Sequence, residues 1–212
     1  MPKKLILVGG GGHCISCIDV IETTGKYEIY GILDVEKKSG QKVLDYAIIG
    51  TDADIDRYAS DGFCFLVTAG HIKTSETREK LYRLIKKANG ILETIIARSA
   101  IVSKYSFIGE GSIVMHNAIV NAEALLGVNC IVNSNALIEH QVQIGNHVHV
   151  STMAAINGNC IIGERIFIGS NSVINQGVRI VDNVVLGSGT VVNKDILLPG
   201  TYAGNPFKSL KD

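Results

Sequence analysis

Histidines in two parts of the chain are the side chains best suited to chemistry. Three of them, His140, His147 and His149, lie within ten residues of one another, and His13 follows the glycine run Gly9–Gly12. An unperturbed imidazole has a pKa near 6.5, so its neutral form is available near pH 7 to take a proton from an attacking hydroxyl or amine. His140 is a candidate general base, because it comes two residues after a regularly spaced isoleucine and is expected to project outward.

The glycine run would let backbone N–H groups at the start of a helix approach a phosphate closely. A tight strand-to-helix turn is the alternative, but four successive glycines exceed what such a turn needs. The run does not match G-x-G-x-x-G, because Cys14 occupies the last required position. The pattern therefore favours a mononucleotide or a nucleotide-linked sugar over NAD or FAD, and the expected contacts are Gly10, Gly11, Gly12 and His13.

An acidic residue and a cysteine pair accompany this turn. Asp34 follows the second predicted strand, where a ribose-binding carboxylate would lie; an ordinary loop carboxylate is the alternative. Cys14 and Cys17 form C-x-x-C, which can be a redox pair or half of a zinc site. No second cysteine pair accompanies them, so we expect both to face the interior from the helix.

The elements that position these residues form a strand–turn–helix–strand unit, which a third strand and a second helix complete. This order is that of a nucleotide-binding βαβ unit and predicts a short Rossmann-like domain at residues 1–92. The predicted strands are Leu5–Val8, Glu28–Leu33 and Phe63–Ala69; the first helix is expected to bury Ile15, Ile18, Val20 and Ile21, and the second runs from Glu76 to Ala88 with Ser75 as its N-cap.

From Ile96 to Val192 every sixth residue is Ile, Leu or Val, seventeen positions with no break in phase. This period predicts a parallel β-helix at residues 93–212, in which each aliphatic side chain points inward and stacks on its equivalent in the next coil. Glycine often follows the aliphatic residue and is expected to serve a corner with positive φ. Cys130 and Cys160 occupy smaller positions that also point inward.

Metal binding is not expected from the histidine spacing. The β-helix of the γ-class carbonic anhydrases resembles this repeat in fold, and those enzymes bind zinc with two histidines five residues apart and a third one coil away. Here the separations are seven and two residues, and His116 lies twenty-four residues before His140. The pattern therefore favours a base over a zinc ligand.

The amino-acid composition indicates which classes of binding partner to expect. Lys plus Arg and Asp plus Glu both number 20, and aromatic residues make up 6%, so nothing favours nucleic acid or an anionic membrane. The apolar run near the N-terminus is too short for a signal peptide, and no segment approaches the length of a membrane span. Five cysteines, an odd number, are typical of a reducing compartment, so we expect a cytoplasmic protein.

The whole chain resembles the sialic acid O-acetyltransferase/bacillosamine N-acetyltransferase family of hexapeptide-repeat sugar acyltransferases. The resemblance implies a Rossmann-like N-terminal domain followed by a left-handed parallel β-helix with eighteen residues per coil. It also implies acetyl-CoA as co-substrate and a homotrimer with CoA between neighbouring β-helices. The segments that carry it are Gly9–His13, Ile32–Asp34, Val132–His140, His147–His149 and Pro199–Pro206.

The resemblance implies roles for single residues. His140 would be the general base, with Asn133 and Glu139 near the acceptor amine or hydroxyl. The coil length places Gly158 one coil beyond His140, where its backbone N–H could meet the thioester oxygen as it becomes an oxyanion. The nucleotide-sugar would be held by Gly10, Gly11, Gly12, His13 and Asp34, and acetyl-CoA by His149, Gly187 and Gly204.

Gln141 departs from the family, whose members often carry an acidic residue directly after the base histidine. Glutamine brings no charge, so either Glu139 takes over that role or His140 is a weaker base. Phe207 stands where the family commonly has alanine.

The predicted function is acetyl-CoA-dependent N-acetylation of a nucleotide-linked aminosugar, such as a UDP-4-amino-4,6-dideoxy sugar, in bacterial surface glycan biosynthesis. Transfer would be direct, since no residue suggests a covalent nucleophile. Two alternatives stay open: O-acetylation of a sialic-acid-type sugar, and a non-catalytic β-helix that only binds nucleotide-sugar.

Overall fold

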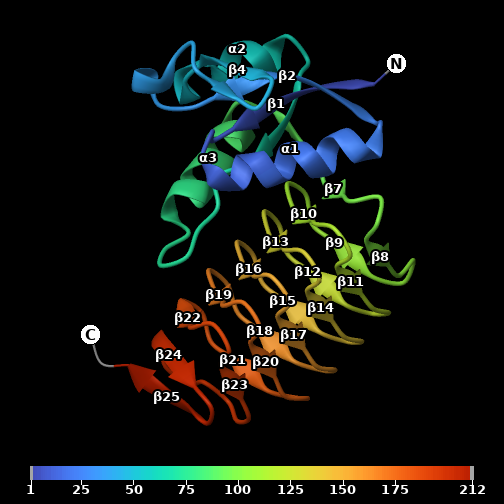
Figure 1. Ribbon diagram of the computed structural model, residues 1–212, viewed down its shortest axis with the longest axis vertical. Helices are drawn as coiled ribbons and strands as arrows, with labels where there is room; N and C mark the ends of the chain where they lie inside the picture. The colour runs from blue at the N-terminus through green and yellow to red at the C-terminus, as the bar shows by residue number, and fades with distance from the viewer. Residues whose placement is uncertain (1, 211–212) are drawn as a thin grey trace.

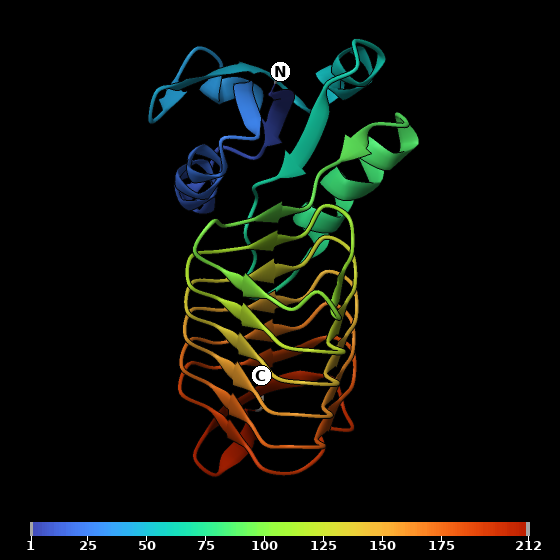
Figure 2. The ribbon, with the colours of Figure 1, turned by 90° about the vertical axis from the view of Figure 1, so that its right-hand side faces the viewer.

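The computed structural model describes residues 2–210, and of Lys37 only the backbone. A sheet flanked by helices lies at one end of the molecule, and a column of stacked coils forms the rest (Figure 1). Figure 2 shows the coils from the side, with the N-terminal sheet beside the first of them. Within the described part of the chain, no helix is long and apolar enough to cross a membrane.

The N-terminal sheet has six strands in the order β3-β4-β2-β1-β5-β6, parallel apart from the β3–β4 hairpin. β1 is central, and Leu5, Ile6 and Leu7 within it are completely buried. The three predicted strands are present, but the prediction missed β3, β4 and β6, which widen the sheet on both sides. The bounds are β1 (Lys3–Val8), β2 (Tyr27–Leu33), β3 (Lys42–Val43), β4 (Tyr46–Gly50), β5 (Cys64–Val67) and β6 (Ile91–Leu92).

The helices of this part are α1 (Gly12–Thr24), α2 (Ile55–Ser60) and α3 (Glu76–Lys87), with short 3-10 turns η1 (Glu36–Lys38) and η2 (Asp52–Asp54). The predicted buried face of α1 is wrong at Ile15, which is 48% exposed. Ile18, Val20 and Ile21 are completely buried, as predicted. Cys14 and Cys17 are completely buried as well, because the spacing i, i+3, i+4, i+7 puts them on one face with Ile18 and Ile21. Both cysteines of the C-x-x-C therefore face the interior, as expected.

The start of α3 also differs from the prediction. Ser75 occupies the N-cap position, but its side chain makes no cap hydrogen bond. The hydroxyl of Thr74 instead accepts a hydrogen bond from the Glu76 N–H at 3.2 Å. The helix ends at Lys87, with Ala88 as its C-cap.

The coils form a three-sided parallel β-helix, as predicted, and consecutive strands on one side are eighteen residues apart. The first sheet contains β7 (Ile95–Ile96), β10 (Ile113–Val114), β13 (Ile131–Val132), β16 (His149–Val150), β19 (Phe167–Ile168), β22 (Val184–Leu186), β24 (Gly200–Gly204) and β25 (Phe207–Leu210). The second contains β8 (Ile101–Val102), β11 (Ile119–Val120), β14 (Leu137–Ile138), β17 (Ala155–Ile156), β20 (Val173–Ile174) and β23 (Val191–Val192). The third contains β9 (Phe107–Ile108), β12 (Leu125–Leu126), β15 (Gln143–Ile144), β18 (Ile161–Ile162) and β21 (Arg179–Ile180).

The interior of the column is filled by the six-residue repeat. From Val114 to Val192 every repeat position is buried, and so are Cys130 and Cys160. The prediction fails in the first coil, where Ile96 is 40% exposed, because no earlier coil stacks on it.

The residues with positive φ at the corners of the β-helix are not the glycines that the sequence predicts. Asn, Gln and His residues adopt the left-handed conformation, for example Gln141 at φ 60° and His147 at φ 59°. The glycines after the aliphatic residues do not. A Cβ on Gly127 would lie 2.7 Å from the Gly145 carbonyl carbon, so glycine is needed there because adjacent coils approach closely.

The two parts of the molecule meet along the first sheet. Ile95, Ile113 and Ile131 point outward from it and are buried in one apolar cluster with residues of α1, among them Cys17 and Ile18. α1 is thereby held against the first three coils, and its N-terminus is fixed relative to the next coils of that sheet.

Candidate functional site

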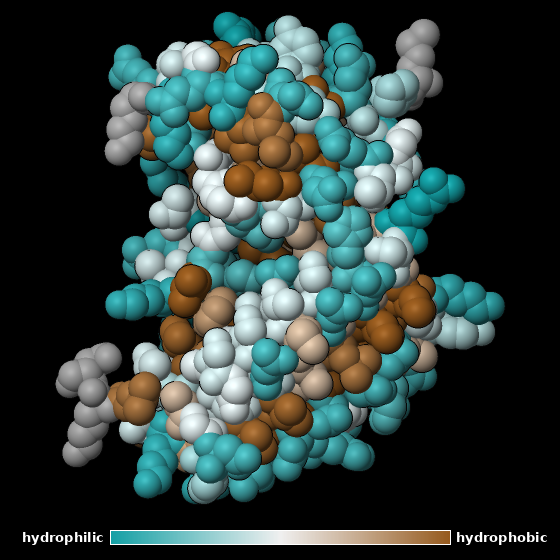
Figure 3. Space-filling model, viewed as in Figure 1, coloured by the Kyte–Doolittle hydropathy of each residue, from teal (hydrophilic) through white to brown (hydrophobic). Residues whose placement is uncertain are grey.

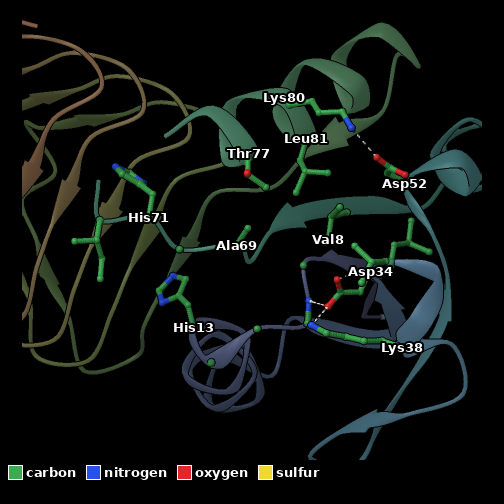
Figure 4. A pocket seen from close by; sticks show the side chains of 18 of the residues that line it. Val8, His13, Asp34, Lys38, Asp52, Ala69, His71, Thr77, Lys80 and Leu81 are labelled. Atoms are coloured by element: carbon green, nitrogen blue, oxygen red, sulfur yellow. Dashed lines mark hydrogen bonds and ion pairs between the residues drawn. The ribbon is translucent and has the colours of Figure 1, made fainter. Parts of the chain in front are cut away.

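A cavity of about 640 Å³ lies where the N-terminal sheet meets the β-helix. Its walls come from the turn after β1, the ends of β2 and β5, the first turns of α3, and His149 of β16. Figure 4 shows Asp34, Lys38, Asp52 and Lys80 around one end. His13 and His71 lie at the other end, beside the β-helix. Predicted site residues line this cavity, among them Gly10, Gly11, Gly12 and His13.

The glycine turn leads into the N-terminus of α1. No side chain caps this helix, and its first turn holds no acidic residue. A Cβ added at Gly11 or Gly12 would meet nothing within 4 Å, so open space lies in front of the turn. Free N–H groups and the positive end of the helix dipole at a cavity wall can bind an anion.

Asp34 holds the turn in place. Its Oδ2 accepts hydrogen bonds from the Gly10 N–H at 2.8 Å and from Lys38 Nζ at 2.7 Å, and its Oδ1 accepts one from the Val35 N–H at 2.7 Å. Burial alone would raise the pKa of Asp34, but these bonds outweigh it and the pKa lies below its usual value. The carboxylate is therefore ionised and already shared among protein donors; direct contact with a ribose stays a prediction.

Three histidines gather at the opposite end of the cavity. The ring centroid of His149 lies 6.1 Å from that of His13 and 5.4 Å from that of His71. His149 Nδ1 is 2.8 Å from the His71 carbonyl oxygen, so Nδ1 must carry the proton and Nε2 is an acceptor. The Asn133 amide lies 3.5 Å from that Nε2. Asn133, His13 and His149 are thus brought together.

These imidazoles are held neutral. Burial, and secondarily nearby charges that include Arg78, lower the pKa of His13 to about 3. The pKa of His71 falls to about 3 and that of His149 to about 4, again mainly through burial. A neutral ring offers one donor and one acceptor, so this end of the cavity suits an uncharged polar group such as a hydroxyl or a free amine.

His140 lies elsewhere, at the corner between the second and third sheets. It borders a shallow, open depression with Glu139, Asn157, Gly158 and Gln176. The ring lies directly against the next coil, because a Cβ on Gly158 would be 2.6 Å from His140 Cε1. The stacking of Gly158 on His140 that the period predicts is therefore confirmed; the catalytic roles of both residues stay predictions.

Two side chains next to His140 in sequence, Glu139 and Gln141, could affect how strong a base it is, because Gln141 stands where the family often has an acidic residue. Gln141 Nε2 donates to Glu123 Oε2 at 2.9 Å, so this side chain points away from the His140 ring. Glu139 Oε2 accepts from Asn121 Nδ2 at 3.0 Å and from the His140 backbone N–H at 3.3 Å. Among residues 2–210, no carboxylate bonds to the His140 imidazole itself.

The predicted site residues fall into separate groups. In a three-sided column, the corner that carries His140 is opposite the sheet that carries His149, so the two cannot share a substrate within one chain. Gly187 lies on the same corner as Asn133, three coils further along, and Gly204 ends β24 with φ 103°. The acetyl-CoA roles of His149, Gly187 and Gly204 stay predictions.

Sequence reasoning missed several residues of the cavity. His71 lies in the loop after β5, and Lys38 and Lys80 reach the rim in ion pairs with Asp34 and Asp52. The position of His71 just after a strand that ends at the cavity was the available signal, since loops at the carboxyl ends of parallel strands carry ligands. In the described part of the chain, no group of three or more His, Cys, Asp or Glu side chains could hold a metal ion.

Comparison with known proteins gives consistent results. Residues 4–85 match the family described as the PglD N-terminal domain. The acetyltransferase domain of PglB from Neisseria gonorrhoeae FA1090 has 30% sequence identity and a TM-score of 0.91, covering 98% of this chain and 100% of that one. The same domain in complex with acetyl coenzyme A has a TM-score of 0.92, with 30% identity over 99% of this chain and 100% of that one.

A second relative is perosamine N-acetyltransferase from Caulobacter crescentus, a variant of which was solved in complex with CoA and GDP-perosamine. It has 28% identity and a TM-score of 0.92, covering 99% of this chain and 97% of that one. A search of curated proteins gave no match.

Proposed function

This chain belongs to the bacterial sugar acetyltransferases that carry a PglD N-terminal domain, and from that premise we propose that it acetylates the amine of a nucleotide-linked aminosugar. The chain is an acetyl-CoA-dependent enzyme, and sugar N-acetylation is the reaction of its relatives. The observation that carries the finer proposal is the cavity, which joins an uncapped helix N-terminus to a cluster of neutral imidazoles.

The two ends of the cavity suit the two halves of a nucleotide-sugar. A diphosphate fits the free N–H groups at Gly11 and Gly12, where the helix dipole favours negative charge. The aminosugar would then extend toward His13, Asn133 and His149, whose Nε2 can accept a hydrogen bond from an amine or hydroxyl. This position favours a contact between His149 and the sugar in addition to the predicted acetyl-CoA contact.

The chemistry requires removal of one proton. The neutral amine attacks the thioester carbonyl carbon, a C–N bond forms, and the C–S bond breaks as CoA leaves. His140 would take the proton from the amine, and the Gly158 N–H would donate to the carbonyl oxygen while it carries negative charge.

A second copy of the chain would complete the site, because His140 and the cavity lie on opposite sides of one column. The outward residues of the second sheet supply a surface for such a contact, and Figure 3 shows apolar side chains over these strands. Ile101 is 63% exposed. This arrangement supports the predicted homotrimer. The outward residues are Ile101, Ile119, Leu137, Ala155, Val173 and Val191.

The test is release of free CoA thiol from acetyl-CoA with a panel of UDP-, GDP- and CMP-sugars, with and without a free amine. We expect turnover only with aminosugar acceptors. The variant His140→Ala should lower kcat by about 10²–10⁴-fold, the range for loss of a general base, while the dissociation constant of the nucleotide-sugar stays near that of the wild type.

Other outcomes would identify the alternatives. Turnover only with sialic-acid-type hydroxyl acceptors would move the assignment to O-acetylation, which the same base could serve. Binding of nucleotide-sugars without turnover on any acceptor of the panel would contradict N-acetylation of a nucleotide-linked aminosugar.

A further inference from the structure

Arg78 of α3 is completely buried, although it carries a charge. Within residues 2–210 no carboxylate pairs with it, and its guanidinium bonds only to backbone carbonyl oxygens. A buried cation without an anion is costly, and an apolar side chain would serve simple packing better. The five donors of arginine are spread over a wide planar fork, which can bridge carbonyl groups that lie on two different elements.

The bonds of Arg78 join the cavity wall to the β-helix. Nη1 donates to the Val67 carbonyl at 2.6 Å and to the Ala69 carbonyl at 3.0 Å, both at the end of β5. Nε donates to the Asn129 carbonyl at 3.0 Å, and Nη2 to the Gly111 carbonyl at 3.4 Å, both in corners of the β-helix.

The wall that these bonds reach is the segment Ala69–Gly70–His71, which lines the cavity beside the glycine turn. The two walls are in close contact, since a Cβ on Gly9 would lie 2.8 Å from the Ala69 N. The far end of the segment is anchored separately, because His149 Nδ1 donates to the His71 carbonyl at 2.8 Å. Arg78 and His149 thus attach both ends of one short wall to the β-helix.

We propose that Arg78 is a positioning residue for nucleotide-sugar binding, which acts by fixing the Ala69–Gly70–His71 wall to the β-helix without touching the ligand. This inference rests on the proposed function. The positive charge behind the wall has a second effect, because it adds to burial in lowering the pKa of His13, His71 and His149. The wall is therefore held both in place and in its neutral form.

The experiment compares Arg78→Lys and Arg78→Met with Arg83→Met, an arginine on the same helix whose side chain is 74% exposed and pairs with Glu79. Lysine keeps the charge but cannot reach both sets of carbonyls, and methionine keeps much of the length without donors. We expect both Arg78 variants to raise KM and Kd for the nucleotide-sugar by about tenfold or more, with KM for acetyl-CoA unchanged. Arg83→Met should leave all three values unchanged.

A role in stability alone gives a different pattern. It would lower the Tm and the active fraction, and hence the apparent kcat, while KM for the nucleotide-sugar stays unchanged in folded protein. That pattern, a wild-type KM in Arg78→Lys, or an equal rise in Arg83→Met would overturn the proposal. If Arg78→Met does not fold, Arg78→Lys alone decides.

A double-mutant cycle gives a second test. Because Arg78 is inferred to act through the wall, Arg78→Lys in a His71→Ala background should raise KM much less than it does in the wild type. Fully additive effects would contradict the inference. Failure of wild-type protein to bind or acetylate any nucleotide-sugar would instead refute the proposed function, which separates the two failures.

Discussion

At the scale of single residues, the position of the His140 ring depends on Gly158, which lies one coil away and has no side chain. Its ring occupies the space that a Cβ on Gly158 would need, with His140 Nε2 at 2.7 Å and Nδ1 at 3.2 Å from that position. Glycine at 158 thus does two things in the proposed mechanism: it leaves room for the base, and its N–H would donate to the thioester oxygen.

The variant Gly158→Ala separates these two contributions. The added methyl keeps the N–H but must push the His140 ring aside, since a contact of 2.6 Å to Cε1 cannot persist. We expect kcat to fall by about 10²-fold, as for a displacement of about 1 Å at a reacting group, while Kd for the nucleotide-sugar is unchanged. Steady-state kinetics and calorimetry on the same preparation measure both. A wild-type kcat would show that His140 is not the base.

The His140–Gly158 pair could be predicted from sequence, because the eighteen-residue coil determines which residues stack. His71 and Arg78 could not be predicted in the same way. Arg78 looks like a surface residue of an amphipathic helix, between Glu76 and Glu79, and only the docking of α3 on the β-helix buries it. Charged residues buried at a junction depend on how two elements meet, which local spacing does not encode.

At the scale of elements, the site depends on α1 and the first sheet packing together. Ile113 of β10 points outward from the β-helix but is completely buried beneath α1. Ile161 of β18 has the equivalent outward position on the third sheet and is 37% exposed. The two isoleucines form a matched pair that differs in whether another element covers them.

Ile113→Ala should therefore weaken the junction. We expect a loss of about 2–5 kcal/mol in the free energy of unfolding, since a large buried side chain is removed and a cavity remains. Ile161→Ala should cost less than about 1 kcal/mol. Urea unfolding followed by circular dichroism measures both, and equal losses would contradict the packing described at this junction.

The inward face of the β-helix could be predicted from the period of six, whereas the face that docks α1 could not. Outward positions are apolar on more than one sheet, for example Ile113 on the first, Leu137 on the second and Ile161 on the third. The first sheet is chosen because the chain enters it directly from β6, which brings α1 and α3 to that side. Connectivity, not hydrophobicity, decides the docking face.

At the scale of the whole molecule, the buried histidines make stability depend on pH. The folded-state pKa values of His13, His71 and His149 are about 3, 3 and 4, below the value near 6.5 expected in the unfolded chain. Below pH 6.5 the unfolded chain therefore takes up protons that the folded protein does not. Stability is fully present above pH 6.5 and falls as the pH decreases toward 4.

The expected slope is up to about 1.4 kcal/mol per pH unit for each histidine. Urea midpoints at pH 7.5, 6.5 and 5.5 measure it, and His71→Leu should flatten the decrease between pH 6.5 and 5.5. Asp34, Glu93 and Glu110 also have lowered pKa values, but their contribution is lost only below the ordinary carboxyl range and does not affect this interval. A stability that stays constant from pH 7.5 to 5.5 would contradict the neutral cluster.

The proposal of a site shared between copies predicts complementation between two inactive variants. His140→Ala lacks the base but keeps the cavity, and His149→Ala alters the cavity but keeps the base, so neither trimer should turn over well alone. In a cyclic trimer that contains both variants, one of the three sites combines an intact cavity with an intact His140 from the neighbour. Co-expression with two different affinity tags and sequential purification would isolate the mixed trimers. We expect the purified mixed trimers to show about one third of wild-type kcat per chain, against the residual rate of each variant alone. If base and cavity came from the same chain, every site in the mixture would carry one defect and no activity would return.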